Sequence, residues 1–138
     1  MIRDYLQDAL QLLLPETPNW YSWAKTDSDG NKIPNDQRMQ TKYVIVEESQ
    51  IGKVTRPTDA EINAKVTELK NAEPMNVLRG ERNRKLAETD WWCCSDRTPT
   101  QAQLNYRTAL RDLPSTASPN LDENGQLTGV TWPTKPTE

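Results

Sequence analysis

Histidine is absent from the 138-residue sequence, and this absence excludes most of the common catalytic chemistries. Ser-His-Asp and Cys-His catalysis both need an imidazole, and so do most catalytic zinc sites. A pair of carboxylates can act without histidine, but the 20 acidic residues are scattered along polar segments, as expected of any protein surface. We therefore expect a protein that is not an enzyme and that holds neither a cofactor nor a metal.

Long apolar runs are also missing. No stretch approaches the roughly 18 consecutive apolar residues of a membrane span. Asp4, Gln7, Asp8 and Gln11 interrupt the apolar residues near the start, which therefore lack the pattern of a signal peptide. We expect no membrane partner, and we expect the chain to be made in the cytosol.

Cysteine and phenylalanine are scarce. The only two cysteines, Cys93 and Cys94, are neighbours, and a disulfide between them would close a small strained ring, so two reduced thiols are expected. A hydrophobic share of 34% predicts a small core, with part of the chain extended or packed on a partner. Phenylalanine is absent, so five tryptophans and four tyrosines supply the aromatic area, and these rings also favour interfaces.

The first half of the sequence predicts a helix and a small sheet. Apolar residues recur at helical spacing over residues 2–14, beginning with Ile2. The β-branched run 41–48 is the best strand candidate, within a two- or three-stranded sheet between residues 20 and 55. Asp27 begins a turn signal, DSDGN, whose glycine comes too early for a calcium loop.

The second half predicts three helices. Thr58 and Glu61 form a capping box at the start of the first, which should end before Pro74. The next covers residues 75–88, where Gly80 suggests a close approach or a kink. Thr98 should cap the last, which continues to about residue 113.

A proline-rich tail follows these helices, with a possible edge strand at residues 129–132. The expected fold class is α+β: an N-terminal helix and small antiparallel sheet, then a C-terminal helical hairpin with the tail. We expect two domains, an attachment arm or small sheet module over residues 1–57 and a helical module over residues 58–138.

The basic residues of the segment 79–85 precede two tryptophans, a combination that could contact nucleic acid. Acidic residues interleave with them, however, and the net charge is −3, so a solvated helix is favoured and no nucleic-acid partner is expected. Arg82 lies on an apolar stripe, where its guanidinium needs carboxylate or carbonyl partners. We predict a structural clamp between Arg82 and Asp90, with Asp96 as the alternative partner.

Adjacent tryptophans should point in opposite directions, so Trp91 and Trp92 either both enter the core or place one ring outside. The side chains that we expect to contact a partner are apolar. They are Trp20, Trp23, Trp91, Trp92, Tyr106 and Leu110.

The C-terminal region, about residues 75–136, resembles the phage tail assembly chaperone proteins and the related tail-fibre assembly proteins of tailed phages. An ordered set of residues carries the resemblance: Leu78, Arg79, Arg82, Asn83, Leu86, Ala87, Thr89, Asp90, Trp91, Asp96, Gln103, Tyr106, Arg107, Leu110, Arg111, Asp112, Leu113, Trp132 and Pro133. The resemblance implies a non-enzymatic role in building a tail or tail fibre, in which the hairpin masks a sticky surface of a tail-fibre or baseplate protein.

The alternative is a permanent virion component, an adaptor in the tail, baseplate or fibre. The sequence leaves open whether the chain stays in the virion and whether it self-associates.

Overall fold

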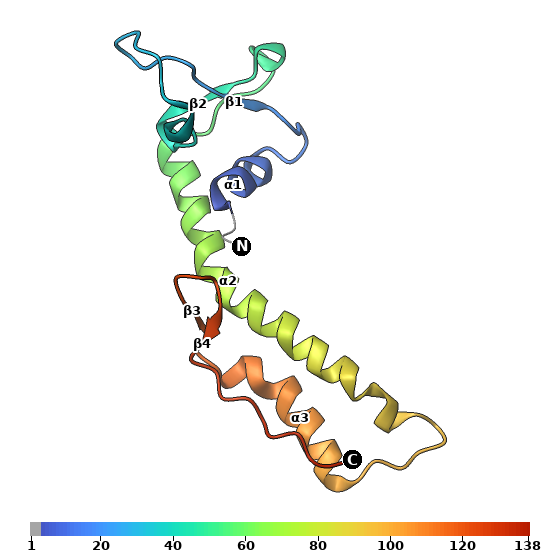
Figure 1. Ribbon diagram of the computed structural model, residues 1–138. Helices are drawn as coiled ribbons and strands as arrows, with labels where there is room; N and C mark the ends of the chain where they lie inside the picture. The colour runs from blue at the N-terminus through green and yellow to red at the C-terminus, as the bar shows by residue number, and fades with distance from the viewer. Residues whose placement is uncertain (1–3) are drawn as a thin grey trace. The chain divides into compact units, whose positions relative to one another are not determined.

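The computed structural model describes residues 4–138, which divide into two compact units between residues 71 and 72. We call residues 4–71 the N-terminal unit and residues 72–138 the C-terminal unit. Each has its own cluster of buried apolar side chains. Helices together with two small antiparallel sheets confirm the predicted α+β class (Figure 1). The predicted division at residues 57 and 58 into an arm and an assembly module stays a prediction.

The N-terminal unit begins with helix α1 (Tyr5–Leu13). Asp4 caps it, because its carboxylate accepts hydrogen bonds from the first free amides of the helix. Ile2, where the predicted helix began, lies outside the described residues. The buried side of α1 presents Leu10, whose carbonyl accepts a 2.7 Å hydrogen bond from the Trp20 indole nitrogen.

Strands β1 (Tyr21–Trp23) and β2 (Val44–Val46) form an antiparallel ribbon. The strand predicted over residues 41–48 is shorter, because 3₁₀ turns η2 (Thr41–Tyr43) and η3 (Glu48–Gln50) occupy its two ends. A further turn, η1 (Asn35–Gln37), lies in the connection, and the Asp27 carboxylate organises the expected tight turn. The inner face of the ribbon packs on the core formed by Leu10, Trp20, Val44 and Ile62.

Helix α2 (Asp59–Glu88) corrects one prediction. The capping box of Thr58 and Glu61 is confirmed, but the helix does not end before Pro74, which lies inside it. Proline removes one backbone hydrogen bond at a cost of about 3 kcal/mol, which flanking residues of high helix propensity can offset. Beyond the helix's own backbone, no atom lies within 4 Å of the place that a Cβ at Gly80 would take. The close approach suggested there therefore does not occur.

The C-terminal unit continues with the 3₁₀ helix η4 (Asp90–Cys93) and helix α3 (Gln101–Thr116). The cap of α3 is Thr100 rather than Thr98, because Gln103 at the third position completes a capping box with Thr100. This pair satisfies two of the free amide groups at the helix start, which Thr98 and Pro99 could not do.

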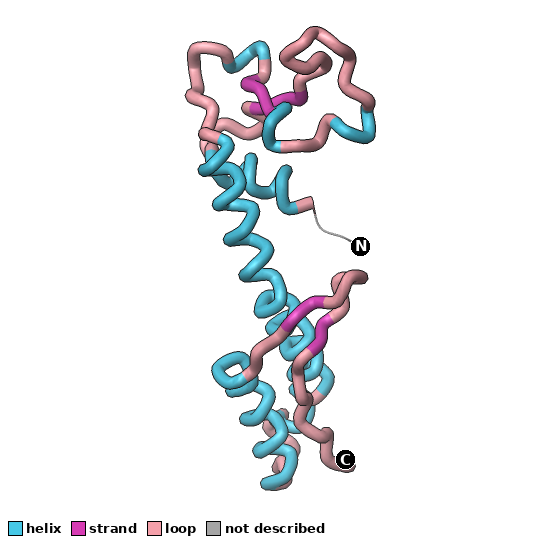
Figure 2. The backbone as a smooth tube through the Cα atoms, turned by 90° about the vertical axis from the view of Figure 1, so that its left-hand side faces the viewer, coloured by secondary structure: helices cyan, strands magenta, loops and turns pink. Residues whose placement is uncertain are grey.

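Strands β3 (Asn120–Leu121) and β4 (Leu127–Thr128) form a second hairpin. The edge strand predicted over residues 129–132 is wrong. Gly129 has a φ of +75°, and this left-handed conformation ends β4 before the predicted strand could begin. The tail then runs alongside α3 in both views (Figures 1 and 2). Within residues 4–138, no helix combines the length and the apolar character that crossing a membrane requires.

Candidate partner-binding surfaces

A buried arginine holds the two helices of the C-terminal unit together. The Arg107 guanidinium donates to the Leu86 carbonyl at 2.9 Å and to the Thr89 hydroxyl at 2.7 Å. It also makes a 2.9 Å ion pair with Asp90. Arg107 is only 8% exposed and Thr89 is fully buried. Because α3 provides the donor and the end of α2 provides the acceptors, this network fixes the hairpin turn.

Arg107 thus has the structural role that we predicted for Arg82. Arg82 instead donates to the Asn83 side chain and, at 3.3 Å, to the Arg111 carbonyl on α3. Asp90 belongs to the clamp, but its partner is Arg107. A signal was present in the sequence: Arg107 follows Tyr106 and lies one turn before Leu110, at the flank of the apolar stripe. A planar fork of donors suits such a place, because it can satisfy several acceptors at once.

The apolar core of the C-terminal unit consists of Trp92, Tyr106 and Leu110, with Leu86 and Trp132 packed against it. Trp92 and Leu110 are fully buried and Tyr106 is 7% exposed. These three residues were expected to contact a partner, but the structure buries them because they fill the hairpin interior. Trp20 is likewise buried in the N-terminal unit. All four side chains belong to the cores of the two units, and their contact with a partner stays a prediction.

The structure shows one of the two placements predicted for Trp91 and Trp92, with one ring inside the core and one outside. Trp92 is buried, while Trp91 is 39% exposed. The Arg97 guanidinium lies 4.2 Å from the centre of the Trp91 ring, and the indole nitrogen donates to the Glu88 carbonyl. These two contacts hold the Trp91 ring in place, so that it presents an aromatic surface at the hairpin turn. The free and exposed Cys93 and Cys94 lie next to it in the sequence.

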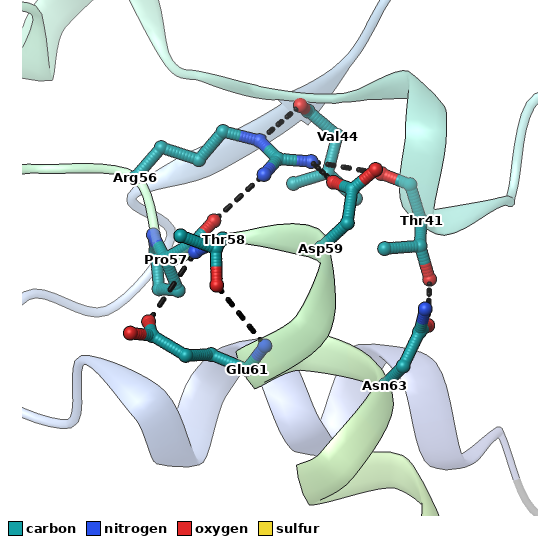
Figure 3. Close-up of polar contacts among 8 residues, drawn as sticks. All are labelled: Thr41, Val44, Arg56, Pro57, Thr58, Asp59, Glu61 and Asn63. Carbon is teal, nitrogen blue, oxygen red and sulfur yellow. Dashed lines mark hydrogen bonds and ion pairs between the residues drawn. The ribbon is translucent and has the colours of Figure 1, made fainter.

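A second arginine protects one edge of the ribbon in the N-terminal unit. Figure 3 shows the Arg56 guanidinium between β2 and the start of α2. It donates to the carbonyl groups of Val44 and Thr41 at 2.8 and 2.9 Å, and it pairs with Asp59 at 2.7 Å. Since these carbonyl groups belong to β2 and the turn before it, Arg56 occupies part of the edge at which another strand could pair.

The opposite edge, on β1, is open. Ser22 is paired with Ile45 in the antiparallel register. Backbone N–H···O hydrogen bonds of 2.7 and 2.8 Å at the two ends of the ribbon show that every second residue of β1 bonds to β2. The backbone amides of Tyr21 and Trp23 consequently point away from β2. Within residues 4–138, no hydrogen bond from another segment reaches them.

A shallow groove lies beside this edge, on the outer face of the ribbon. Both strands line it, together with residues 47, 48 and 51. Ile45 and Ile51 are 44% and 67% exposed there, and Trp23 is half-buried. Lys25 from the β1 side and the acidic pair Glu47 and Glu48 from the β2 side also line the groove. An apolar floor with charges of both signs suits a peptide segment better than a small metabolite.

The described residues offer no cluster for a metal: no group of three or more His, Cys, Asp or Glu side chains is suitably placed within them. The polar side chains at the centre of the C-terminal unit, Arg107, Thr89 and Asp90, are engaged with one another. They act as structural groups that hold a helical hairpin.

The C-terminal unit is thus a helical hairpin held together by Arg107 and covered by an extended tail. Residues 75–137 match the model of a family described as phage tail assembly chaperone protein. The predicted resemblance is confirmed for this region, and it supports a role in phage tail assembly. No curated protein and no solved structure matches the chain.

The residues that carry the resemblance now have physical roles. Thr89, Asp90 and Arg107 form the clasp, and Gln103 caps α3. Tyr106 and Leu110 of the motif belong to the core cluster around Trp92, and Leu86 and Trp132 pack against it, whereas Trp91 is 39% exposed. The motif therefore describes how the hairpin holds together rather than which surface meets a partner.

Proposed function

We propose that this chain is a non-enzymatic phage tail assembly protein that binds a structural tail protein, of the tail fibre or the baseplate, at the open edge of β1. The match of the hairpin to the assembly chaperone family carries the assembly role. The unpaired backbone of Tyr21 and Trp23 supports the mode of binding. Both parts are consistent with action in the host cytoplasm while tails are being built.

Strand addition suits an assembly protein because it hides a sticky edge without covalent chemistry. A tail protein that awaits assembly exposes strand edges, which tend to pair with the wrong chain. A segment paired with β1 would receive backbone hydrogen bonds, and its side chains would meet the groove. The charges there favour a segment with an apolar residue between a basic and an acidic one, to match Glu47, Glu48 and Lys25.

Co-expression with the tail-fibre and baseplate proteins of the same phage tests the proposal. We expect a stable complex in which the amide groups of Tyr21 and Trp23 exchange hydrogen more slowly than in the free chain. Ile51→Lys should weaken this complex about tenfold or more, because it places a charge in the groove. Met39→Lys is the matched control, since Met39 is 48% exposed but does not line the groove.

Three results would count against the proposal. If the partner folds and assembles equally well without this chain, the assembly role fails. If a complex forms with unchanged exchange at both amides, the binding edge is elsewhere. Equal losses from Ile51→Lys and Met39→Lys would indicate a general loss of apolar surface rather than use of the groove.

The second candidate function is a permanent adaptor in the virion. The observation that favours it is the N-terminal unit, which has its own core and lies outside the matched residues 75–137. An attachment arm would need such an independent unit, whereas an assembly factor that is released would not.

A further inference from the structure

The C-terminal tail, residues 130–138, is held in place by side chains alone. In the part of the chain that the structure describes, no backbone hydrogen bond involves these residues. Trp132 packs against the buried cluster of Trp92, Tyr106 and Leu110. The Lys135 ammonium lies 5.8 Å from the centre of the Trp92 ring. The tail therefore resembles a bound peptide more than an element of the fold.

The surface beneath the tail has the features of a peptide site. The cluster of Trp92, Tyr106 and Leu110 provides an apolar floor, and the Lys85 ammonium lies 5.0 Å from the centre of the Trp132 ring. Trp132 thus has apolar contacts on the hairpin and a cation at its ring. Such a seat selects an aromatic side chain through both burial and charge.

The Trp92 ring, over which Lys135 of the tail lies, carries a polar group without a partner. Trp92 is fully buried, and its indole nitrogen has no hydrogen-bond partner. An unpaired donor in a buried cluster is unfavourable. A competing segment that brings a carbonyl oxygen to this nitrogen would gain a contact that the chain's own tail does not make.

We propose that this surface, which we call the tail groove, is a second binding site, and that its ligand is an extended segment of a partner protein carrying tryptophan followed by proline and lysine. The ligand chemistry is read from the tail that fills the groove: Trp132 enters the apolar seat, Pro133 keeps the backbone extended, and Lys135 lies over Trp92. A partner segment gains access by displacing the tail. This site does not depend on the β1 edge, so its failure would leave the proposed function untouched.

In the free chain, the covalent attachment of the tail determines whether another segment can bind in the tail groove. A covalently attached tail acts at an effective concentration on the order of millimolar, so it excludes weaker competitors. Loosening the tail should therefore open the groove to an added peptide. Trp132→Ala removes the main anchor. Lys135→Ala removes the tail's contact with Trp92, retains Trp132 and leaves the groove itself unchanged.

The test uses the full chain and a fluorescein-labelled synthetic peptide, GVTWPTKPTE, which is the sequence of residues 129–138. We expect the peptide to bind the Trp132→Ala chain about tenfold or more tightly than the unsubstituted chain, measured by fluorescence anisotropy. The same peptide with alanine in place of its tryptophan is the matched control and should not bind. If circular dichroism shows that Trp132→Ala unfolds the hairpin, Lys135→Ala replaces it.

Several outcomes would overturn the tail groove. Equal binding to unsubstituted and loosened chains would show that the peptide docks elsewhere. Binding that does not require the peptide's tryptophan would remove the aromatic seat, and no binding to a folded loosened chain would remove the site. A loosened chain that instead sediments as a dimer, dissociated by the peptide, would make a second copy the occupant.

Discussion

At the scale of single residues, the C-terminal unit depends on one guanidinium. Arg107 takes its three acceptors from residues 86, 89 and 90, at the point where α2 gives way to η4. The C-terminal end of a helix leaves backbone carbonyl groups without hydrogen-bond partners inside the helix. Arg107 donates from α3 to acceptors at this helix end. One side chain therefore both supports the end of α2 and holds α3 against it. Arg56 does similar work in the N-terminal unit, where it joins β2 to the start of α2.

Arg107→Met should destabilise the protein by about 1–3 kcal/mol, because it removes the donor to the buried Thr89 hydroxyl and leaves the Leu86 carbonyl with only its hydrogen bonds from Thr89. Arg111→Met is the control. Arg111 is exposed, and only its backbone carbonyl is used, so a change of less than about 0.5 kcal/mol is expected. Urea unfolding followed by circular dichroism measures both. Similar values for the two variants would show that the clasp contributes little.

At the scale of elements, α2 is longer than its sequence suggests. Pro74 and Gly80 both oppose a helix locally, yet the helix is continuous from Asp59 to Glu88. The division between the compact units, at residues 71 and 72, lies close to Pro74. Contacts made by side chains such as Ile62 and Leu78, which are fully buried in different units, offset the local cost.

Gly80→Ala should stabilise the protein by about 1 kcal/mol, since alanine restricts the unfolded chain and its methyl group would meet no atom beyond the helix's own backbone. The contrasting variant is Gly52→Ala. That site is equally open, but its φ of +82° should make alanine destabilising by about 1 kcal/mol. Thermal melting of both variants gives the measurement. A loss of stability from Gly80→Ala would mean that the glycine serves a purpose other than helix formation.

At the scale of the whole molecule, two units with separate cores divide the chain between a region that matches an assembly family and a region that does not. This division allows two fates. An assembly factor leaves once the tail is complete, whereas an adaptor remains with it. The contact surfaces in the two units are compatible with either fate.

An inventory of purified virions by quantitative mass spectrometry separates these fates. We expect the chain to be absent, or present far below one copy per tail, because the family match indicates an assembly role. A tail structural protein measured in the same sample serves as the internal standard. A stoichiometric amount of this chain would favour the adaptor instead.

The sequence by itself determined the features that rest on local chemistry. The capping box of Thr58 and Glu61, the tight turn at Asp27 and the α+β class follow from residue types at short spacing. For Trp91 and Trp92 the sequence left two placements open, and only the structure showed that Trp92 is buried and Trp91 is 39% exposed. The ordered motif of the C-terminal region was enough to identify the family resemblance.

Only the tertiary structure decided which residues are partners across the chain. The choice of Arg107 over Arg82 depends on how α3 is rotated against the end of α2, and side-chain spacing within one helix does not contain that rotation. The same packing buried Trp20, Trp92, Tyr106 and Leu110, because a small core with no phenylalanine must use its other large side chains. Which edge of a ribbon stays open likewise depends on a contact, that of Arg56, made over 12 and 15 residues of sequence.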